Sequence, residues 1–223
     1  MESKKSALYK AAYENFDEKG AFKVGPLTSE KMRVDPQYVM FQQARYKHAA
    51  KLLEKKSKIF DVGAGDGVGL PILCHYFSDV LAIDIDQHLL NQSQNSLDEN
   101  FSCDFLLHDF SKAPLDDLYD AGVCFDVMSL IPPDKESSWM KNVSRSLAED
   151  GMFVIGTQNK NIIHLGNPEN HVDQPNFKDA DGLYVLMSNH FVNVIMLAMN
   201  DEVLHTGKKE TCQYLIGVGI CPK

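Results

Sequence analysis

The chain has 223 residues, of which 44% are hydrophobic and 24% are charged, an ordinary composition for one sizeable α/β domain. Its formal net charge of -9 argues against a nucleic-acid backbone or an anionic membrane as the main partner, because both usually meet basic surfaces. The five scattered cysteines form no C-x-x-C pair and no zinc spacing, and neither a signal peptide nor a membrane-spanning apolar run occurs. We therefore expect a reduced, cytoplasmic protein without a metal site.

The N-terminal part of the sequence predicts helices. Residues 3–18 fit a short amphipathic helix that stops near Gly20. A longer helix begins at Asp35, which can cap it, and Pro36, which suits the first helical position. We expect residues 1–56 to form a helical cap over the rest of a single domain that spans residues 1–223.

From residue 57 onward, short apolar runs alternate with helical stretches. This alternation predicts an α/β fold with a doubly wound, mostly parallel sheet of seven strands. Residues 57–157 form the expected ligand-binding core, and residues 158–223 supply a cover loop, a helix and closing strands. The expected strands lie at 58–63, 80–85, 103–110, 121–130, 152–157, 192–199 and 212–221.

The first strand ends in a glycine-rich loop, "FDVGAGDGVG". The dinucleotide fingerprint G-x-G-x-x-G fails here, because the third glycine would fall at Val68 or Leu70, and this makes a nicotinamide dehydrogenase a poor interpretation. The spacing is instead D-x-G-x-G-x-G. Ordering so many glycines is costly, which indicates that a ligand comes close to this backbone.

Three acids follow at or near the ends of later strands: Asp84, Asp109 and Asp126. Ligands of open parallel sheets bind at these carboxyl ends, and an acid at the end of the second strand can accept the two ribose hydroxyls of a nucleoside. The acidic edge of the glycine loop, Asp61 and Asp66, would repel a pyrophosphate but suits an ammonium or sulfonium group. The pattern therefore favours an adenosine that carries a cationic amino-acid tail.

Four elements in this order, "FDVGAGDGVG", "VLAIDID", "FLLHDF" and "FDVMSLIPP", resemble the class I S-adenosylmethionine-dependent methyltransferases. The resemblance implies a Rossmann-like methyltransferase fold, with S-adenosylmethionine as cofactor and S-adenosylhomocysteine as product. It also implies a set of donor-binding residues: Asp61, Gly63, Ala64, Gly65, Asp84, Ile85, Asp109, Phe110 and Asp126.

The resemblance gives each donor-binding residue an expected contact. Gly63 and Gly65 let the backbone approach the methionyl part, and Asp61 contacts its amino-acid end. Asp84 holds the ribose, and Ile85 packs on the adenine. Asp109 is expected to accept from the adenine amino group, with Phe110 beside the adenine ring. Asp126 and Val127 are expected to border the donor.

The flanking segments resemble a narrower group. "GPLTS", "DPQYVMFQQARYKHAAKLL" and "MNDEVLHTG" are similar to small bacterial methyltransferases of surface-polysaccharide synthesis, including enzymes that O-methylate phosphoramidate groups of capsules. Many relatives have Glu-His before the prolines after the fourth strand. This chain has Ser129-Leu130, so no function of that histidine carries over.

The acceptor-side residues follow from the chemistry of the acceptor, which we expect to be a small molecule. An alcohol would need a general base, for which His171 and His205 are candidates. An anionic phosphoryl or carboxylate oxygen needs no base but a cationic clamp, for which Arg45 is the best candidate. The lack of a base motif favours the anion, and hence O-methylation. N-methylation of an amine or amino sugar, and a non-catalytic donor-binding protein, are the alternatives.

Overall fold

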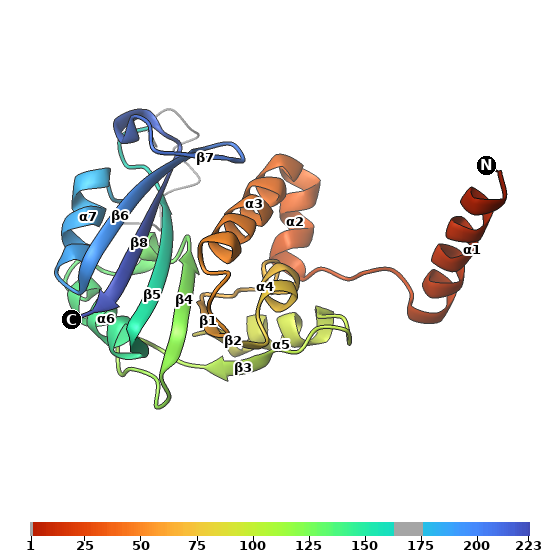
Figure 1. Ribbon diagram of the computed structural model, residues 1–223, viewed down its shortest axis with the longest axis horizontal. Helices are drawn as coiled ribbons and strands as arrows, with labels where there is room; N and C mark the ends of the chain where they lie inside the picture. The colour runs from red at the N-terminus through yellow and green to blue at the C-terminus, as the bar shows by residue number, and fades with distance from the viewer. Residues whose placement is uncertain (1, 163–175) are drawn as a thin grey trace.

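The computed structural model describes residues 2–162 and 176–223, without the side chains of residues 2–6 and 8. It contains one sheet with the strand order β3-β2-β1-β4-β5-β8-β6-β7 (Figure 1). The strands are β1 (Lys58–Val62), β2 (Asp79–Asp84), β3 (Asp104–Leu107), β4 (Tyr119–Phe125), β5 (Leu147–Gln158), β6 (Phe191–Asn200), β7 (Val203–His205) and β8 (Tyr214–Pro222).

The sheet corrects the predicted number of strands and shows the direction of each strand. The described residues form eight strands, because the chain turns at Asp201 and pairs the three residues of β7 with the end of β6. So short an edge strand has no apolar run that the sequence could reveal. The sheet is also mixed: β1 to β5 pair in parallel, whereas β8 runs antiparallel to β5 and to β6.

Helices cover both faces of the sheet, as a doubly wound fold requires. The helices of the described residues are α1 (Glu2–Lys19), α2 (Pro26–Val34), α3 (Pro36–Leu52), α4 (Leu70–Tyr76), α5 (Gln87–Ser96), α6 (Glu136–Arg145) and α7 (Ala180–Ser188), with short 3-10 turns at Met128–Leu130 and Lys209–Thr211. Asp35 caps α3 as predicted, accepting from the backbone N–H of Tyr38, and Pro36 occupies the first turn.

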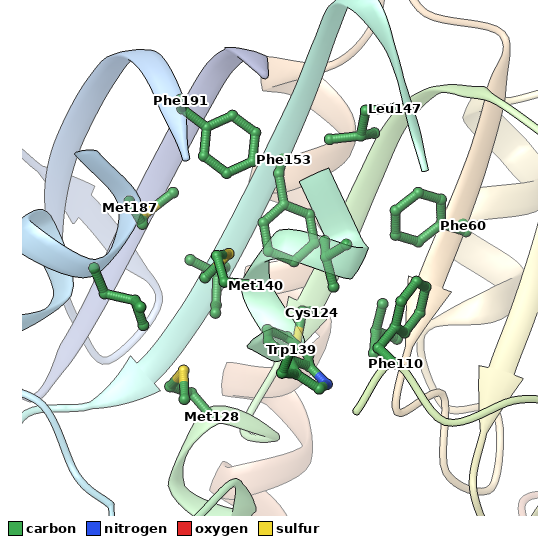
Figure 2. Close-up of a cluster of buried hydrophobic side chains, with 14 of the residues drawn as sticks. Phe60, Phe110, Cys124, Met128, Trp139, Met140, Leu147, Phe153, Met187 and Phe191 are labelled. Atoms are coloured by element: carbon green, nitrogen blue, oxygen red, sulfur yellow. The ribbon is translucent and has the colours of Figure 1, made fainter. Parts of the chain in front are cut away.

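Two apolar clusters fill the space between sheet and helices. Successive side chains of a strand point to opposite faces, so Ile59 packs with α3 and α4, while Phe60 packs with α6 and α7. Figure 2 shows the second cluster, where Phe153 of β5 lies among Phe60, Trp139 and Phe191. A sheet packed on both faces holds the carboxyl ends of β1, β2 and β4 rigidly beside one another.

The N-terminal helices differ in how they meet the sheet. The helix α1 stands apart from the rest of the molecule (Figure 1), and its side chains from Tyr9 to Lys19 are exposed. Lys19 at its end pairs with Glu99 at 2.8 Å. Helices α2 and α3 pack together beside the glycine loop. That residues 1–56 form a cap stays a prediction. Within this segment, α2 and α3 are the helices that border the glycine loop.

Candidate functional site

The glycine loop leaves β1 in a conformation that glycine favours. Gly63, Gly65 and Gly67 all have positive φ, at 74°, 58° and 83°. The backbone N–H groups of Gly63 and Ala64 donate to the carbonyl of Ile83, at 2.8 and 3.0 Å. The loop is therefore fastened to the end of β2 before any ligand binds.

The glycines of this loop serve different purposes. A Cβ on Gly63 would collide with Val127, and one on Gly67 would collide with Ser93, so close packing requires both. A Cβ on Gly65 would meet nothing nearer than 3.9 Å. At Gly65 the loop backbone is therefore accessible to a ligand, as we expect for a glycine that a ligand approaches closely. Gly69 abuts the Tyr46 ring, which agrees with a packing function.

A cavity of about 520 Å³, here called the loop pocket, opens beside Gly65. It brings together six of the predicted donor-binding residues: Gly63, Ala64, Gly65, Asp84, Ile85 and Asp126. Residues of α2 and α3 form its other wall: Leu27, Thr28, Glu30, Lys31, Tyr38, Gln42 and Tyr46. A volume of this size is typical of small-molecule sites.

Asp84 and Ile85 form one side of the loop pocket. Asp84 Oδ2 accepts from the backbone N–H of Gly65 at 2.9 Å, and Oδ1 accepts from that of Asp86 at 3.0 Å. These bonds fix the carboxylate at the rim while leaving lone pairs for hydroxyl donors. Ile85 is 74% exposed, an unusual position for a large apolar side chain unless a flat apolar ligand covers it.

A second cavity, the strand-end pocket, continues past Ile85. Its lining includes Asp109 and His108, and its volume is about 540 Å³. The Asp109 carboxylate accepts from the Ser111 N–H at 2.9 Å and pairs with Lys112 at 3.2 Å. The hydrogen bonds from Ser111, followed by those of Lys112, lower the pKa of Asp109. Ile85 lines both pockets, so the two adjoin at this side chain.

Phe110 was expected beside the adenine ring, but it lines neither of these pockets. It is 2% exposed and packs against Phe60 and Trp139 in the core (Figure 2). The chain turns at the end of β3, which sends Phe110 inward while Asp109 stays at the surface. The His108 ring packs edge-on against the Phe110 ring and hydrogen-bonds the carbonyl of Ala113, which indicates a structural function.

Asp61 is fully buried below the loop rather than at its open edge. Tyr46 donates its hydroxyl to Asp61 Oδ2 at 3.1 Å, and Oδ1 has no hydrogen-bond partner. Burial raises the pKa of Asp61 to about 7, against the lowering effect of the Tyr46 hydrogen bond and with a further increase from Asp84. An unpartnered buried carboxylate oxygen next to the loop is suited to a cationic group. Contact with a donor remains a prediction.

Arg45 is buried and already paired. Its Nη1 donates to Asp126 Oδ2 at 2.8 Å, and its guanidinium lies 3.7 Å from the centre of the Tyr214 ring. Burial alone would lower the pKa of Arg45, but Asp126, with Tyr214 and Tyr38, raises it. The side chain therefore keeps its charge, and that charge is balanced within the protein.

The partner carboxylate, Asp126, sits on a strained backbone. Its φ is 63°, a left-handed value that costs a non-glycine residue about 1 kcal/mol. The Tyr38 hydroxyl also donates to Oδ2, at 3.4 Å, and burial raises the pKa of Tyr38 so that it stays protonated. Both bonds end on Oδ2, and the Asp126 side chain, which is 23% exposed, lines the loop pocket.

The two candidate histidines are not brought to the pocket by the described structure. His205 ends β7, where its ring bonds the Asn200 side chain at 3.1 Å and accepts from the Gly207 N–H at 3.0 Å. It does not line the loop pocket. His171 lies outside the described residues. Both assignments remain predictions.

Sequence reasoning missed the contact that joins α2 to the glycine loop. The Asp66 carboxylate accepts from the Thr28 N–H at 2.7 Å and from the Thr28 hydroxyl at 2.9 Å. A Cβ on Gly25 would collide with Asp66, which explains the glycine of "GPLTS". The signal was present in that motif, a glycine, a helix-starting proline and a small hydroxyl residue, but its partner lies 38 residues away.

The sequence around this site matches a known protein family. Residues 59–151 match the family model of a methyltransferase domain. The matched segment runs from β1 into β5. A search of curated protein sequences finds no match.

Solved methyltransferases have a fold similar to that of this chain. An S-adenosylmethionine-dependent methyltransferase from Clostridium acetobutylicum is 14% identical, with a TM-score of 0.67, covering 97% of this chain and 100% of that one. A TehB-like methyltransferase from Corynebacterium glutamicum is 18% identical, with a TM-score of 0.61, covering 99% and 100%. The N-methyltransferase NodS from Bradyrhizobium japonicum, solved with S-adenosylhomocysteine, is 15% identical with a TM-score of 0.61, covering 82% and 88%. These likenesses establish the class I methyltransferase fold.

Among the described residues, no helix has the length and apolar character needed to cross a membrane. Nor does that part of the chain contain three or more His, Cys, Asp or Glu side chains grouped as a metal site would require.

Proposed function

We propose that this methyltransferase domain binds S-adenosylmethionine in the loop and strand-end pockets and transfers its methyl group to a small polar acceptor. The family match and the S-adenosylhomocysteine complex of NodS support this cofactor. A small-molecule acceptor, rather than a nucleic acid or a membrane component, fits the net charge of -9. A cytoplasmic location stays a prediction.

One observation carries the proposal: a bare, left-handed Gly65 lies beside a fixed Asp84 carboxylate and an exposed Ile85. The three fit successive parts of the donor, because a backbone without Cβ accommodates the methionyl chain, a carboxylate accepts from two ribose hydroxyls, and an exposed aliphatic side chain packs on adenine. Asp109 in the strand-end pocket is then placed for the adenine amino group.

When bound, S-adenosylmethionine supplies a methyl group on a positively charged sulfur, which is already activated for in-line displacement. The residues of the protein position the reactants and exclude water. Ile85 and Leu27 shield the pocket on two sides. Tyr38 holds its proton at the Asp126 carboxylate, so it acts as a hydrogen-bond donor and not as a base.

An oxygen of an anionic phosphoryl, phosphoramidate or sugar intermediate of surface-polysaccharide synthesis is one candidate acceptor. It rests on the resemblance of the flanking segments and on a cationic clamp at Arg45. The pairing of Arg45 with Asp126 weakens the second support, because the guanidinium is not free to neutralise a substrate. Lys31, which also lines the loop pocket, is then the cation nearest such an acceptor.

An amine is the second candidate, and the charges of the loop pocket favour it. Its described lining carries five acidic side chains against Lys31, namely Glu30, Asp66, Asp84, Asp86 and Asp126. Asp66 is occupied by Thr28, but the Asp126 carboxylate lines the pocket and is 23% exposed. An N–H of an amine or amino sugar can donate to this carboxylate, which would orient the nitrogen lone pair. We therefore propose an amine acceptor ahead of an anionic one.

Calorimetric titration with S-adenosylmethionine, S-adenosylhomocysteine and NAD tests the donor assignment. We expect micromolar binding of the first two and none of NAD. Silence toward both sulfur nucleosides, from folded protein free of carried-over ligand, would overturn the proposal. A release assay for S-adenosylhomocysteine with matched amine and phosphorylated sugars then separates the acceptors. Donor binding without turnover on any acceptor would favour the non-catalytic alternative.

A further inference from the structure

The helix α2 forms one wall of the loop pocket but has little apolar attachment of its own. Within α2, all of whose residues are described, Thr28 is the one buried side chain. Leu27, Met32 and Val34 are more than half exposed, at 52%, 51% and 72%. Burial of apolar surface is the usual anchor of a surface helix, so α2 depends on other contacts to keep its place.

The contact at Thr28 is a pair of hydrogen bonds to one carboxylate. Both oxygens of Asp66 accept from Thr28, one from the backbone N–H and one from the hydroxyl, at 2.7 and 2.9 Å. Thr28 is 3% exposed and Asp66 is 5% exposed. Bonds to an ionised acceptor are stronger than neutral ones, and here they are shielded from water. We call this pair the latch.

Open space lies on both sides of the latch. On one side is the loop pocket, and on the other is a cavity of about 340 Å³, the rear cavity, between α2, α3 and α5. Thr28, Asp66 and Val68 line both. Because neither side is filled with packed side chains, the two bonds of the latch are the main attachment of the start of α2 to the glycine loop.

The position of α2 matters for the proposed donor site. Leu27 precedes Thr28, and its Cδ1 lies 3.9 Å from the place where a Cβ of Gly65 would stand. Leu27, Glu30 and Lys31 all line the loop pocket. A displacement of α2 would therefore open the pocket directly above the bare backbone of Gly65.

We propose that Asp66 and Thr28 are positioning residues of the donor site, which act by holding α2 as a wall across the methionyl end of the loop pocket. This inference rests on the proposed function. Since both carboxylate oxygens of Asp66 are used by Thr28, the latch acts on a bound donor through Leu27 and its neighbours. Loss of the latch would release α2 and shorten the lifetime of the bound donor.

The test compares Thr28→Val with wild type by calorimetry and stopped-flow binding of S-adenosylhomocysteine. Valine keeps the shape of the side chain but removes the hydroxyl bond, so we expect about a tenfold weaker affinity, mainly through faster dissociation. Thr28→Ser restores the hydroxyl and should bind within about threefold of wild type. Ser29→Ala, which changes an exposed neighbouring hydroxyl, is the matched control.

A second measurement reports on α2 itself. Trypsin can cut after Lys23, Lys31 and Arg33, and S-adenosylhomocysteine should protect these bonds in wild type but much less in Thr28→Val. A lower melting temperature with unchanged affinity and unchanged protection would overturn the inference, because the latch would then be merely structural. Failure of both Thr28→Val and Asp66→Asn to fold would overturn it as well. Absence of binding by wild type itself would instead refute the proposed function.

Discussion

Replacing Gly65 with alanine separates the folding function of the loop from its binding function. Gly65 has a φ of 58°, so alanine there costs about 1 kcal/mol of conformational free energy. No further cost arises inside the protein, because the nearest atoms, the Gly63 carbonyl oxygen and Leu27 Cδ1, lie 3.9 Å from the new Cβ. A loss of this size should lower the melting temperature by about 2–4 °C.

The new methyl group would stand where we place the methionyl chain of the donor. We therefore expect calorimetric affinity for S-adenosylhomocysteine to fall by about tenfold or more, well beyond the change in stability. Gly20→Ala is the matched control: its φ is 77°, nothing lies within 4 Å of its Cβ, and it is remote from the pocket. Equal affinity of Gly65→Ala, Gly20→Ala and wild type would refute the placement of the donor at this loop.

Three further predictions concern carboxylates. Asp84→Asn should weaken S-adenosylhomocysteine binding by about tenfold to a hundredfold in calorimetry, whereas Asp104→Asn, at the opposite end of the neighbouring strand β3, should not. Burial raises the pKa of Asp61 from 3.8 to about 7 in the folded state, so that state retains a proton that the unfolded chain releases. The free energy of unfolding should therefore fall as pH rises from about 4 to 7 and level off above, and urea titrations should show a flatter profile for Asp61→Asn. Arg45→Met should cost about 3 kcal/mol of stability by leaving Asp126 unpaired, and clearly less in an Asp126→Asn background; equal costs would mean that the ion pair contributes nothing.

The alternation of strands and helices along the chain was readable because each element buries one face or stripe against the same core. The five parallel strands, their helices and the cap of α3 all follow from patterns a few residues long. The short strand β7 was not predicted, because three edge residues that are fixed by pairing with β6 have no periodic pattern in the sequence. Its existence depends on a partner strand.

The donor side of the candidate site was largely predictable for the same reason. The glycine loop, Asp84 and Ile85 lie at the ends of adjacent strands, and parallel strands bring their carboxyl ends to one edge. Phe110 was misplaced, although it directly follows Asp109. Which of two neighbours turns inward after a strand ends depends on the path of the backbone, and here the core around Phe60 accommodates the ring.

The five parallel strands, the position of the glycine loop and the chemistry of the strand ends could be predicted, because they depend on local periodicity and on the geometry that parallel pairing imposes. Which charges are free could be learned only from the folded structure. Arg45 meets Asp126 across 81 residues and loses its availability as an anion clamp, and Asp66 is bound to Thr28 rather than open to a ligand. Pairing of charges requires atoms within a few ångströms of each other, and that proximity arises only when distant segments have packed together.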